Sequence, residues 1–479
     1  MPDARARLGG QERLTLAVLL TASFMGILDV LIVNVAAPAI QRGLRADFSD
    51  IQLVISGYVL AYAVALTTGG RLGDSLGKRR VFRIGLLAFA AFSAGCAAAP
   101  SVGVLIVLRV GQGLAAALML PQVLSLIQAI FPARQRAHAL ALYGATMGMG
   151  AVVGQLVGGV LIRLDILGLG WRSVFLVNVP IGLLAAAAAR RVLPESRGSR
   201  VPLDGAGLLL SALATTLLVY PLVRGSAGGW PWWIWPAFAG SALALAALWH
   251  TEQRQESAGR TPLVPPSMLR NPGFLTGLGT ALAFYTGNYG LFLLLAYVFQ
   301  EGLHLSPLAS GIAFLPLGIG FAAASLYSRR LVDRHGNAVL RLGAGTMAIG
   351  YAVLFVTLLP GPASTGAVEA AAMALALVLA GVGQGLVSAP LIGAILGTVR
   401  RQDAGAGSGI VLSVNQLASS LGVAGLGAVF VALLGADPQA GGSHLGAQDF
   451  TTALSGCSWV LLALALTTGL LARRIPDRS

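Results

Sequence analysis

The sequence has few charged residues, since only 10% of its 479 residues are Asp, Glu, Lys or Arg, against about 25% in ordinary soluble proteins. With 56% hydrophobic residues, a soluble chain of this length would lack polar side chains to cover its surface. This deficit excludes a cytosolic enzyme. The net charge of +14 does not indicate nucleic-acid binding, because the basic residues stand in short clusters between long apolar runs. We therefore expect an integral membrane protein without a nucleic-acid partner.

Several sequence features of enzymes and ATP-driven pumps are also missing. The only two cysteines, Cys96 and Cys457, lie inside apolar runs, as small buried core residues do. No His lies in the middle of an apolar run, and no His, Cys, Asp or Glu cluster has metal-ligand spacing. There is no G-x-x-x-x-G-K-[ST] phosphate loop. We therefore expect no enzymatic activity, no metal and no cofactor.

Apolar runs of about 20 residues, long enough for a helix to cross a bilayer, fill most of the chain. There are fourteen such runs, which predicts an all-α membrane protein with fourteen transmembrane helices. The runs lie near 14–39, 51–70, 81–99, 103–130, 138–163, 171–193, 203–223, 231–249, 274–299, 308–328, 338–359, 368–396, 408–434 and 451–472. Basic clusters follow alternate runs, so the positive-inside rule places both termini in the cytoplasm. We expect a multi-pass protein of the bacterial cytoplasmic (inner) membrane.

Two short motifs occur twice, which indicates an internal repeat. Residues 110–114 and 382–386 both read V-G-Q-G-L, and R-L-G-D at 71–74 resembles R-L-V-D at 330–333. The distance in sequence between the two copies of each motif exceeds the roughly 200 residues that six helices and their loops need. The surplus matches two helices inserted between two six-helix halves. The predicted 6+2+6 division is residues 1–200, 201–250 and 251–479.

Five motifs in the predicted order resemble those of the major facilitator superfamily. Residues 70–80, G-R-L-G-D-S-L-G-K-R-R, resemble the signature G-x-L-a-D-r-x-G-r-r, and R-V-G-Q-G at 109–113 resembles R-x-x-q-G. Residues 150–159 are similar to the antiporter signature G-x-x-x-G-P-x-x-G-G, with Gln in place of the proline. Residues 28–38 and 171–182 are typical of the branch with fourteen helices. The chain thus resembles the drug–proton antiporters of that branch.

This resemblance implies two parallel halves with a substrate path between them and transport by alternating access. It implies a proton-coupled exporter of small amphiphilic organic compounds or drugs, which works as a monomer in the bilayer and uses the proton gradient as its energy source. One alternative is a lipid or metabolite exporter or facilitator of the same fold without strict proton antiport. Another is a sensor or scaffold that transports nothing.

Two charged side chains stand apart from the rest because they lie within apolar runs. Asp29 is the only acidic residue away from the ends of a predicted span, where a carboxylate costs several kcal/mol unless it faces a cavity or a partner. Arg109 is the only base away from the ends of a span, and the matching arginine of the family is implicated in proton translocation. We interpret both as candidates for proton coupling. Structural roles, in helix packing for Asp29 and in bonding to backbone carbonyls for Arg109, stay open.

Other motif residues suggest conformational roles. Asp74 lies among cations and can cap a helix or pair with basic side chains, so it is either a latch of one conformation or a solvated loop charge. Together with its repeat, the candidate latch consists of Asp74, Lys78, Arg79, Asp333 and Arg334. A second set forms a small-residue stripe for close helix packing, namely Gly150, Gly154, Gly158 and Gly159.

Uncharged polar residues in the predicted spans are candidates for lining the substrate path. Amide and aromatic groups in an apolar cavity suit an amphiphilic organic molecule better than an ion. These residues are Asn34, Gln155, Tyr285, Asn288, Tyr289, Gln384, Asn415 and Gln416. Each of them could instead serve helix packing. No second acid lies deep in the C-terminal half, which favours a neutral or singly charged substrate.

Overall fold

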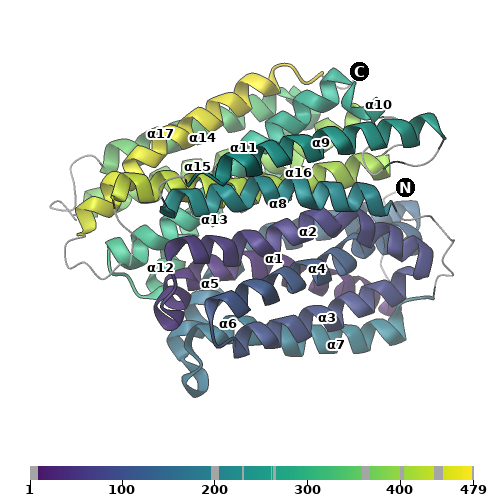
Figure 1. The fold of residues 1–479 in the computed structure, drawn as a ribbon, viewed down its shortest axis with the longest axis horizontal. Helices are drawn as coiled ribbons and strands as arrows, with labels where there is room; N and C mark the ends of the chain where they lie inside the picture. The colour runs from purple at the N-terminus through teal and green to yellow at the C-terminus, as the bar shows by residue number, and fades with distance from the viewer. Residues whose placement is uncertain are drawn as a thin grey trace, which may run out of the picture.

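The computed structural model describes residues 9–195, 204–228, 231–259, 262, 266–358, 367–399, 404–435 and 446–476. Nearly all of these residues are helical, and none of them forms a β-strand. Figure 1 shows the long helices running side by side along the long axis of one bundle. The all-α architecture predicted from the apolar runs is therefore confirmed for these residues.

The first group of helices, α1 to α7, lies together on one side of the bundle (Figure 1). Its members are α1 Gly10–Leu44, α2 Phe48–Leu76, α3 Lys78–Ala98, α4 Val102–Ile130, α5 Ala133–Leu164, α6 Ser173–Leu176 and α7 Asn178–Val192. Two 3₁₀ turns, Ile166–Gly168 and Gly170–Arg172, connect α5 to α6. The most extensive packing within this group joins α4 to α2 and α3, and α1 to α5.

The second group begins at α11 and occupies the opposite side of the bundle (Figure 1). It comprises α11 Pro272–Tyr297, a π-helical turn Val298–Gly302, α12 Pro307–Ala313, α13 Leu315–His335, α14 Ala338–Leu358, α15 Ala367–Gly397, α16 Ala404–Leu434 and α17 Ala447–Ala472. Here α15 packs on α13 and α14, as α4 packs on α2 and α3 in the first group. The two groups thus share one packing plan.

Between the two groups in sequence come α8 Gly205–Gly228, α9 Ile234–Ser257 and the short α10 Pro266–Leu269. The helices α8 and α9 pack on each other, and α8 also contacts α2 of the first group and α16 of the second. This helix pair therefore touches both groups. The exact domain limits at residues 200 and 250 stay predictions.

Each of the fourteen predicted runs overlaps a helix or two successive helices. Among the described residues, 11 helical segments are long and apolar enough to cross a membrane. The helices α5, α8 and α9, at which three further crossings are predicted, are not among these segments. The chain is thus a multi-pass membrane protein by length and composition, whereas fourteen crossings and the side of the termini stay predictions.

Two predicted runs, 171–193 and 308–328, are each one apolar segment long enough to cross a membrane, but the helix is interrupted at a single residue, Val177 or Phe314, whose backbone stays helical. A proline follows each interruption, Pro180 in the first run and Pro316 in the second. A prolyl residue has no N–H to donate, and its ring clashes with the carbonyl four residues earlier. In both cases the first piece ends shortly before the proline. The first break also places Asn178 at the start of α7, where its side chain joins the site described below.

Polar caps determine where some helices start. The Ser101 side chain accepts a hydrogen bond from the Val104 N–H (3.4 Å) at the start of α4. At the start of α11, Asn271 Oδ1 accepts from the Gly273 N–H at 3.0 Å, and Pro272 fills the first helical position, where its missing N–H costs nothing. These caps set the register of two helices that carry site residues farther along.

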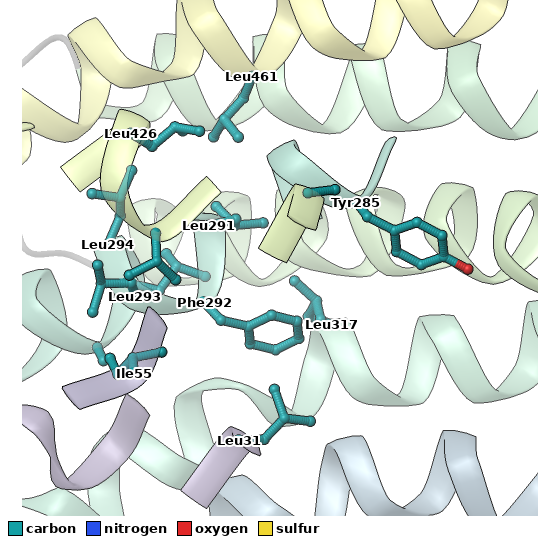
Figure 2. Close-up of a cluster of buried hydrophobic side chains, with 14 of the residues drawn as sticks. Leu31, Ile55, Tyr285, Leu291, Phe292, Leu293, Leu294, Leu317, Leu426 and Leu461 are labelled. Atoms are coloured by element: carbon teal, nitrogen blue, oxygen red, sulfur yellow. The ribbon is translucent and has the colours of Figure 1, made fainter. Parts of the chain in front are cut away.

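A large apolar cluster lies between the two groups of helices. Figure 2 shows Leu31 of α1 and Ile55 of α2 gathered with Leu293 and Leu294 of α11 and Leu317 of α13. All five side chains are at most 5% exposed. The two groups therefore bury apolar surface against each other in this conformation.

Candidate functional site

A buried ion pair joins Asp29 of α1 to Arg109 of α4. Arg109 Nη1 lies 2.5 Å from Asp29 Oδ2, and both residues are 0% exposed. The two residues are 80 positions apart in the sequence, and the packing of α1 against α4 brings them together. The two charged residues that sequence analysis singled out inside spans are thus direct partners.

Two amide side chains complete the surroundings of the carboxylate. Asn178 Nδ2 donates to Asp29 Oδ1 at 2.8 Å, and Gln112 Nε2 donates to the same oxygen at 3.0 Å. Gln112 Oε1 in turn accepts from Arg109 Nη1 at 2.7 Å. Both carboxylate oxygens therefore have donors, and Gln112 bridges the acid and the base. Such charge-assisted hydrogen bonds are what make a buried ion pair tolerable, although Asn178 Oδ1 has no partner among the described residues.

Ser93 of α3 ties these two amides to the helix break. Its hydroxyl oxygen accepts from Gln112 Nε2 and Asn178 Nδ2, both at 3.2 Å, and it donates to the Phe175 carbonyl oxygen at 2.8 Å. The Cys96 thiol lies 3.8 Å from Gln112 Oε1. The network thus spans α1, α3, α4, α6 and α7, entirely within the first group of helices.

The guanidinium of Arg109 is held on its other sides as well. Its Nε donates to the Val54 carbonyl oxygen of α2 at 3.2 Å. The ring centroid of Tyr58 lies 4.2 Å from the guanidinium carbon, and that of Phe175 lies 5.8 Å away. Cation–π contacts of this kind gain strength when they are removed from water. The positive charge is therefore fixed in place, and Asp29 is its only acidic partner among the described residues.

The buried carboxylate and the buried guanidinium depend on each other. Breaking the pair while both side chains stay buried would leave two uncompensated charges inside the protein. A conformational change that separates Asp29 from Arg109 therefore has to compensate both charges in another way. No group of three or more His, Cys, Asp or Glu that could hold a metal occurs in the described ranges.

Sequence analysis did not single out Gln112, Asn178 or Ser93 as site residues. Gln112 and Asn178 lie within two of the motifs that carried the family resemblance, and both are amides in apolar runs, so a signal was present. Ser93 has no comparable signal, because a lone serine in a membrane helix commonly bonds its own backbone.

Asn178→Ala is expected to lower the free energy of unfolding by about 1.5–3 kcal/mol, since it removes a hydrogen bond to a charged group in a buried network. Thermal unfolding of the detergent-purified protein measures the loss. Asn288→Ala is the matched control, because Asn288 is only half-buried on α11 and has no hydrogen bond among the described residues. An equal effect of both substitutions would contradict the importance of the network.

The candidate latch is only partly described. Asp74 belongs to α2, but its side chain lies outside the described part of the structure. Lys78 begins α3. Arg79 forms an ion pair with Glu195 and donates to the Leu193 carbonyl oxygen at 3.1 Å, beyond the end of α7. This contact ties α3 to α7 within one group of helices.

In the second group, Asp333 and Arg334 lie exposed at the end of α13 and form no ion pair with any described residue. The sequence repeat in the second half also lacks the arginine of the ion pair, because Gly381 occupies the position that corresponds to Arg109 in R-V-G-Q-G. The Gln of the repeat, Gln384, donates to the Tyr351 hydroxyl at 3.4 Å. Among the described residues, the buried charge pair is thus confined to the first group.

The glycine stripe of α5 faces α1. A Cβ atom at Gly150 would lie 2.8 Å from Ile27 Cγ2, and one at Gly158 would lie 2.9 Å from Ile32 Cγ1. Gly154 also approaches α1, at 3.3 Å from a side-chain atom. Small residues at four-residue spacing therefore allow the close approach of the two helices.

Three candidate path residues lie together between α11 and α16. The Tyr289 hydroxyl donates to Asn415 Oδ1 at 3.3 Å, and the rings of Tyr285 and Tyr289 lie 6.3 Å apart. The Tyr285 hydroxyl is within hydrogen-bonding reach of Ser388 and Asn415. Figure 2 shows this hydroxyl pointing away from the leucine cluster. These residues form a polar–aromatic patch, which we call the Tyr–Asn patch (Tyr285, Tyr289 and Asn415).

The remaining candidates are dispersed. Gln155 is 1% exposed, and neither polar atom of its side chain has a hydrogen-bond partner among the described residues. Asn34 donates only to the Val30 carbonyl oxygen of its own helix. Gln416 of α16 is buried, whereas Asn288 is half-buried. Gln155 has the largest unmet hydrogen-bonding capacity of these residues, and Asn34 Oδ1 also has no partner among the described residues.

Several hydrogen bonds between the two groups of helices lie near the end of α1, whereas Ser413 and Ser420 of α16 make longer ones, both 3.4 Å, to carbonyl oxygens of α2. The Tyr297 hydroxyl donates to Gln41 Oε1 at 2.7 Å, and Gln300 Nε2 donates to the Val35 carbonyl oxygen at 2.8 Å. These contacts link α1 to α11 and to the π-helical turn. The positive-inside prediction assigns this end to the outer face of the membrane.

Further contacts at the same end strengthen this closure. Arg42 forms an ion pair with Glu301. Gln52, at the start of α2, donates to the Val423 carbonyl oxygen of α16 at 3.0 Å. Gly159 allows α5 to touch α12, since a Cβ atom there would lie 2.6 Å from a backbone oxygen.

Gly159→Val is expected to separate α5 from α12, because the added side chain would collide with the Pro307 carbonyl oxygen, which cannot rotate away. The distance between spin labels at Ile166 and His304 should then shift to longer values. Gly345→Val is the control, since a Cβ atom at Gly345 meets nothing within 4 Å. An unchanged distance distribution in the Gly159 variant would show that this contact does not help to hold the end closed.

The chain matches one family model, described as Major Facilitator Superfamily, over residues 19–423. A probable actinorhodin transporter of Streptomyces coelicolor is 37% identical over 427 residues, which cover 89% of this chain and 73% of that protein. A tetracenomycin C resistance and export protein of Streptomyces glaucescens is 33% identical over 437 residues, or 89% of this chain and 78% of the relative.

Among solved structures, a bacterial homologue of the human lysosomal transporter Spinster superimposes with a TM-score of 0.66. The match covers 97% of both chains at 17% sequence identity. At this identity the likeness concerns the fold, which is that of a membrane transporter.

Proposed function

Because this chain belongs to the Major Facilitator Superfamily, we propose that it exports small amphiphilic organic compounds in exchange for protons. The observation that carries this proposal is the buried Asp29–Arg109 pair, an ionisable switch inside one half of a transporter fold. The resistance and export roles named for its relatives support outward transport of antibiotic-like compounds. The energy source is then the proton gradient, with no bound cofactor.

The proposed cycle couples the ion pair to the movement of the two halves. In this proposal the conformation with contacts at the predicted outer end is the one that opens toward the cytoplasm, and Asp29 is ionised against Arg109 in it. Substrate binding and reorientation separate the pair, and Asp29 then takes up a proton from outside. Return to the cytoplasm-facing state restores the ion pair and expels the proton. Each conformation thereby favours one protonation state, as coupling between two ligands requires.

The substrate contacts belong to uncharged groups in this proposal. The Tyr–Asn patch offers aromatic faces and amide hydrogen bonds, and the buried Gln155 side chain adds an unpartnered amide. These groups suit an aromatic or amphiphilic molecule that is neutral or carries one charge. Asn34, Asn288, Gln384 and Gln416 complete the proposed path.

The finer topology is also part of the proposal. Fourteen crossings, arranged as 6+2+6 with both termini in the cytoplasm, agree with the helices found at every predicted run and with the basic clusters after alternate runs. The chain then lies in the bacterial inner membrane. A monomer suffices, because both halves of the path come from one chain.

Inverted membrane vesicles containing the protein test the proposal. We expect ATP-independent accumulation of ethidium, actinorhodin or tetracenomycin C when the vesicle interior is acidic, and loss of accumulation when an ionophore collapses only the pH gradient. A facilitator would instead equilibrate substrate regardless of that gradient. Gradient-independent transport would therefore favour the alternative, a lipid or metabolite facilitator of the same fold.

A further inference from the structure

An amphipathic groove lies on the surface of the first group of helices, between α3 and α7. Its volume is about 750 Å³, and it is separate from the buried ion pair and from the path between the halves. Three arginines line it, namely Arg83 of α3 and Arg190 and Arg191 at the end of α7. The proposed transport cycle uses none of these three residues.

The rest of the groove is apolar and exposed. Leu87 of α3 is 42% exposed, and Leu183 and Leu184 of α7 are 49% and 71% exposed. Alanines of α7 also line the groove. Exposed leucines on the outside of a membrane bundle face acyl chains, so this wall suits a lipid tail rather than a water-soluble ligand.

The three arginines lie where the headgroup of such a lipid would lie. All three lie at the end of the bundle where α7 ends and α3 begins, which the basic clusters assign to the cytoplasmic interface. Arg83 Nε donates to the Ala186 carbonyl oxygen at 3.2 Å, which fixes this guanidinium at the groove. None of the three pairs with a carboxylate among the described residues, and the nearby Glu195 is engaged by Arg79. The groove therefore presents uncompensated positive charge beside an apolar wall.

We infer that this groove binds an anionic phospholipid, with the phosphate among Arg83, Arg190 and Arg191 and an acyl chain along Leu87, Leu183 and Leu184. Arginine pairs well with phosphate oxygens because its planar guanidinium offers several donors in a fixed geometry. Basic side chains between transmembrane helices on the cytoplasmic side are a recognised setting for anionic headgroups. A zwitterionic lipid carries no net negative charge, so it binds more weakly.

The second half supplies a matched control. Arg473 and Arg474 follow α17, in the repeat position of the pair that ends α7, and both are exposed. Their replacement removes the same charge from the same end of the bundle without touching the groove. A general attraction of basic protein to anionic lipid is thereby separated from a specific site.

Native mass spectrometry of the detergent-purified full chain, titrated with phosphatidylglycerol, tests the inference. The tightest bound phosphatidylglycerol should have its dissociation constant raised about 30-fold in R190Q/R191Q, as expected for two charges near an anionic headgroup. R473Q/R474Q should leave this constant unchanged, and phosphatidylcholine should not bind with comparable affinity. Equal weakening by both double variants, or equal binding of both lipids, would overturn the inference.

Two further arms identify the ligand and guard against misfolding. Inorganic phosphate at millimolar concentration should not displace the lipid, whereas displacement would show a site for the phosphate group alone and overturn the lipid assignment. L184N keeps all three arginines and should also weaken binding, because it removes apolar contact with the acyl chain. R83Q provides a single substitution with a smaller loss, and an elution profile identical to wild type shows that each variant is folded. Lipid binding is measured without transport, so its failure would leave the proposed function untouched.

Discussion

Asp29→Asn should reduce proton-driven accumulation of substrate in inverted vesicles to the level of vesicles without the protein. Asparagine keeps an oxygen that can accept the bonds from Gln112 and Asn178, but it cannot bind and release a proton in this pH range. The variant should still exchange labelled for unlabelled substrate down a concentration gradient, since the path is intact. Loss of coupling with retained exchange is therefore the expected result.

Asp29→Glu is the control for this prediction. It keeps a carboxyl group next to Arg109, although one methylene displaces it, so a reduced but gradient-dependent transport is expected. If Asp29→Asn accumulates substrate as the wild type does while the pH gradient is maintained, Asp29 does not carry the coupling proton. Loss of exchange as well as coupling would identify a structural role for this residue.

Arg109→Gln should lower the free energy of unfolding by about 3–5 kcal/mol, because it leaves the Asp29 carboxylate buried without its cation. It also removes the hydrogen bond to the Val54 carbonyl and the contact with the Tyr58 ring. Reversible unfolding of the purified protein in detergent and denaturant measures the loss. This is the largest stability effect that we expect from a single polar substitution in the network.

The double variant Asp29→Asn with Arg109→Gln tests whether the loss comes from the unpaired charge. With both charges removed, much of the stability should return, while proton coupling should stay absent. Arg42→Gln is the matched control, because it breaks an ion pair with Glu301 in which the arginine side chain is 53% exposed; such pairs contribute less than about 1 kcal/mol. A double variant as unstable as Arg109→Gln alone would contradict this explanation.

Asp29 and Arg109 could be found from the sequence because an isolated charge inside an apolar run is rare and costly. Their contact could not be found, since it depends on how α1 packs on α4 between residues that are 80 positions apart in the sequence. The roles of the amides that complete the network could not be assigned from the sequence for the same reason. An asparagine in a membrane helix looks alike whether it bonds a carboxylate, its own backbone or a substrate, as Asn178 and Asn34 illustrate.

The helical architecture was predictable because the length and hydropathy of a run determine whether it can span a bilayer. The interrupted runs show the limit of that argument, since nothing in the apolar composition marks Val177 and Phe314, at which the helices are interrupted. The groove between α3 and α7 was not predictable either. In the sequence, its arginines are indistinguishable from the basic residues that orient a chain in the membrane. Only the packing of two helices sets Arg83 beside Ala186.

The most direct test of the central claim, that Asp29 exchanges one proton against substrate, is a proton count in the absence of any gradient. Wild-type protein in weakly buffered detergent solution, protonated at mildly acidic pH, receives a compound that shows gradient-dependent efflux, and a pH-sensitive dye records proton release. We expect about one proton per chain from the wild type, release from Asp29→Glu as well, and none from Asp29→Asn, because substrate and proton oppose each other through this carboxyl group. Equal release from Asp29→Asn and wild type, or none from the wild type, would contradict the claim.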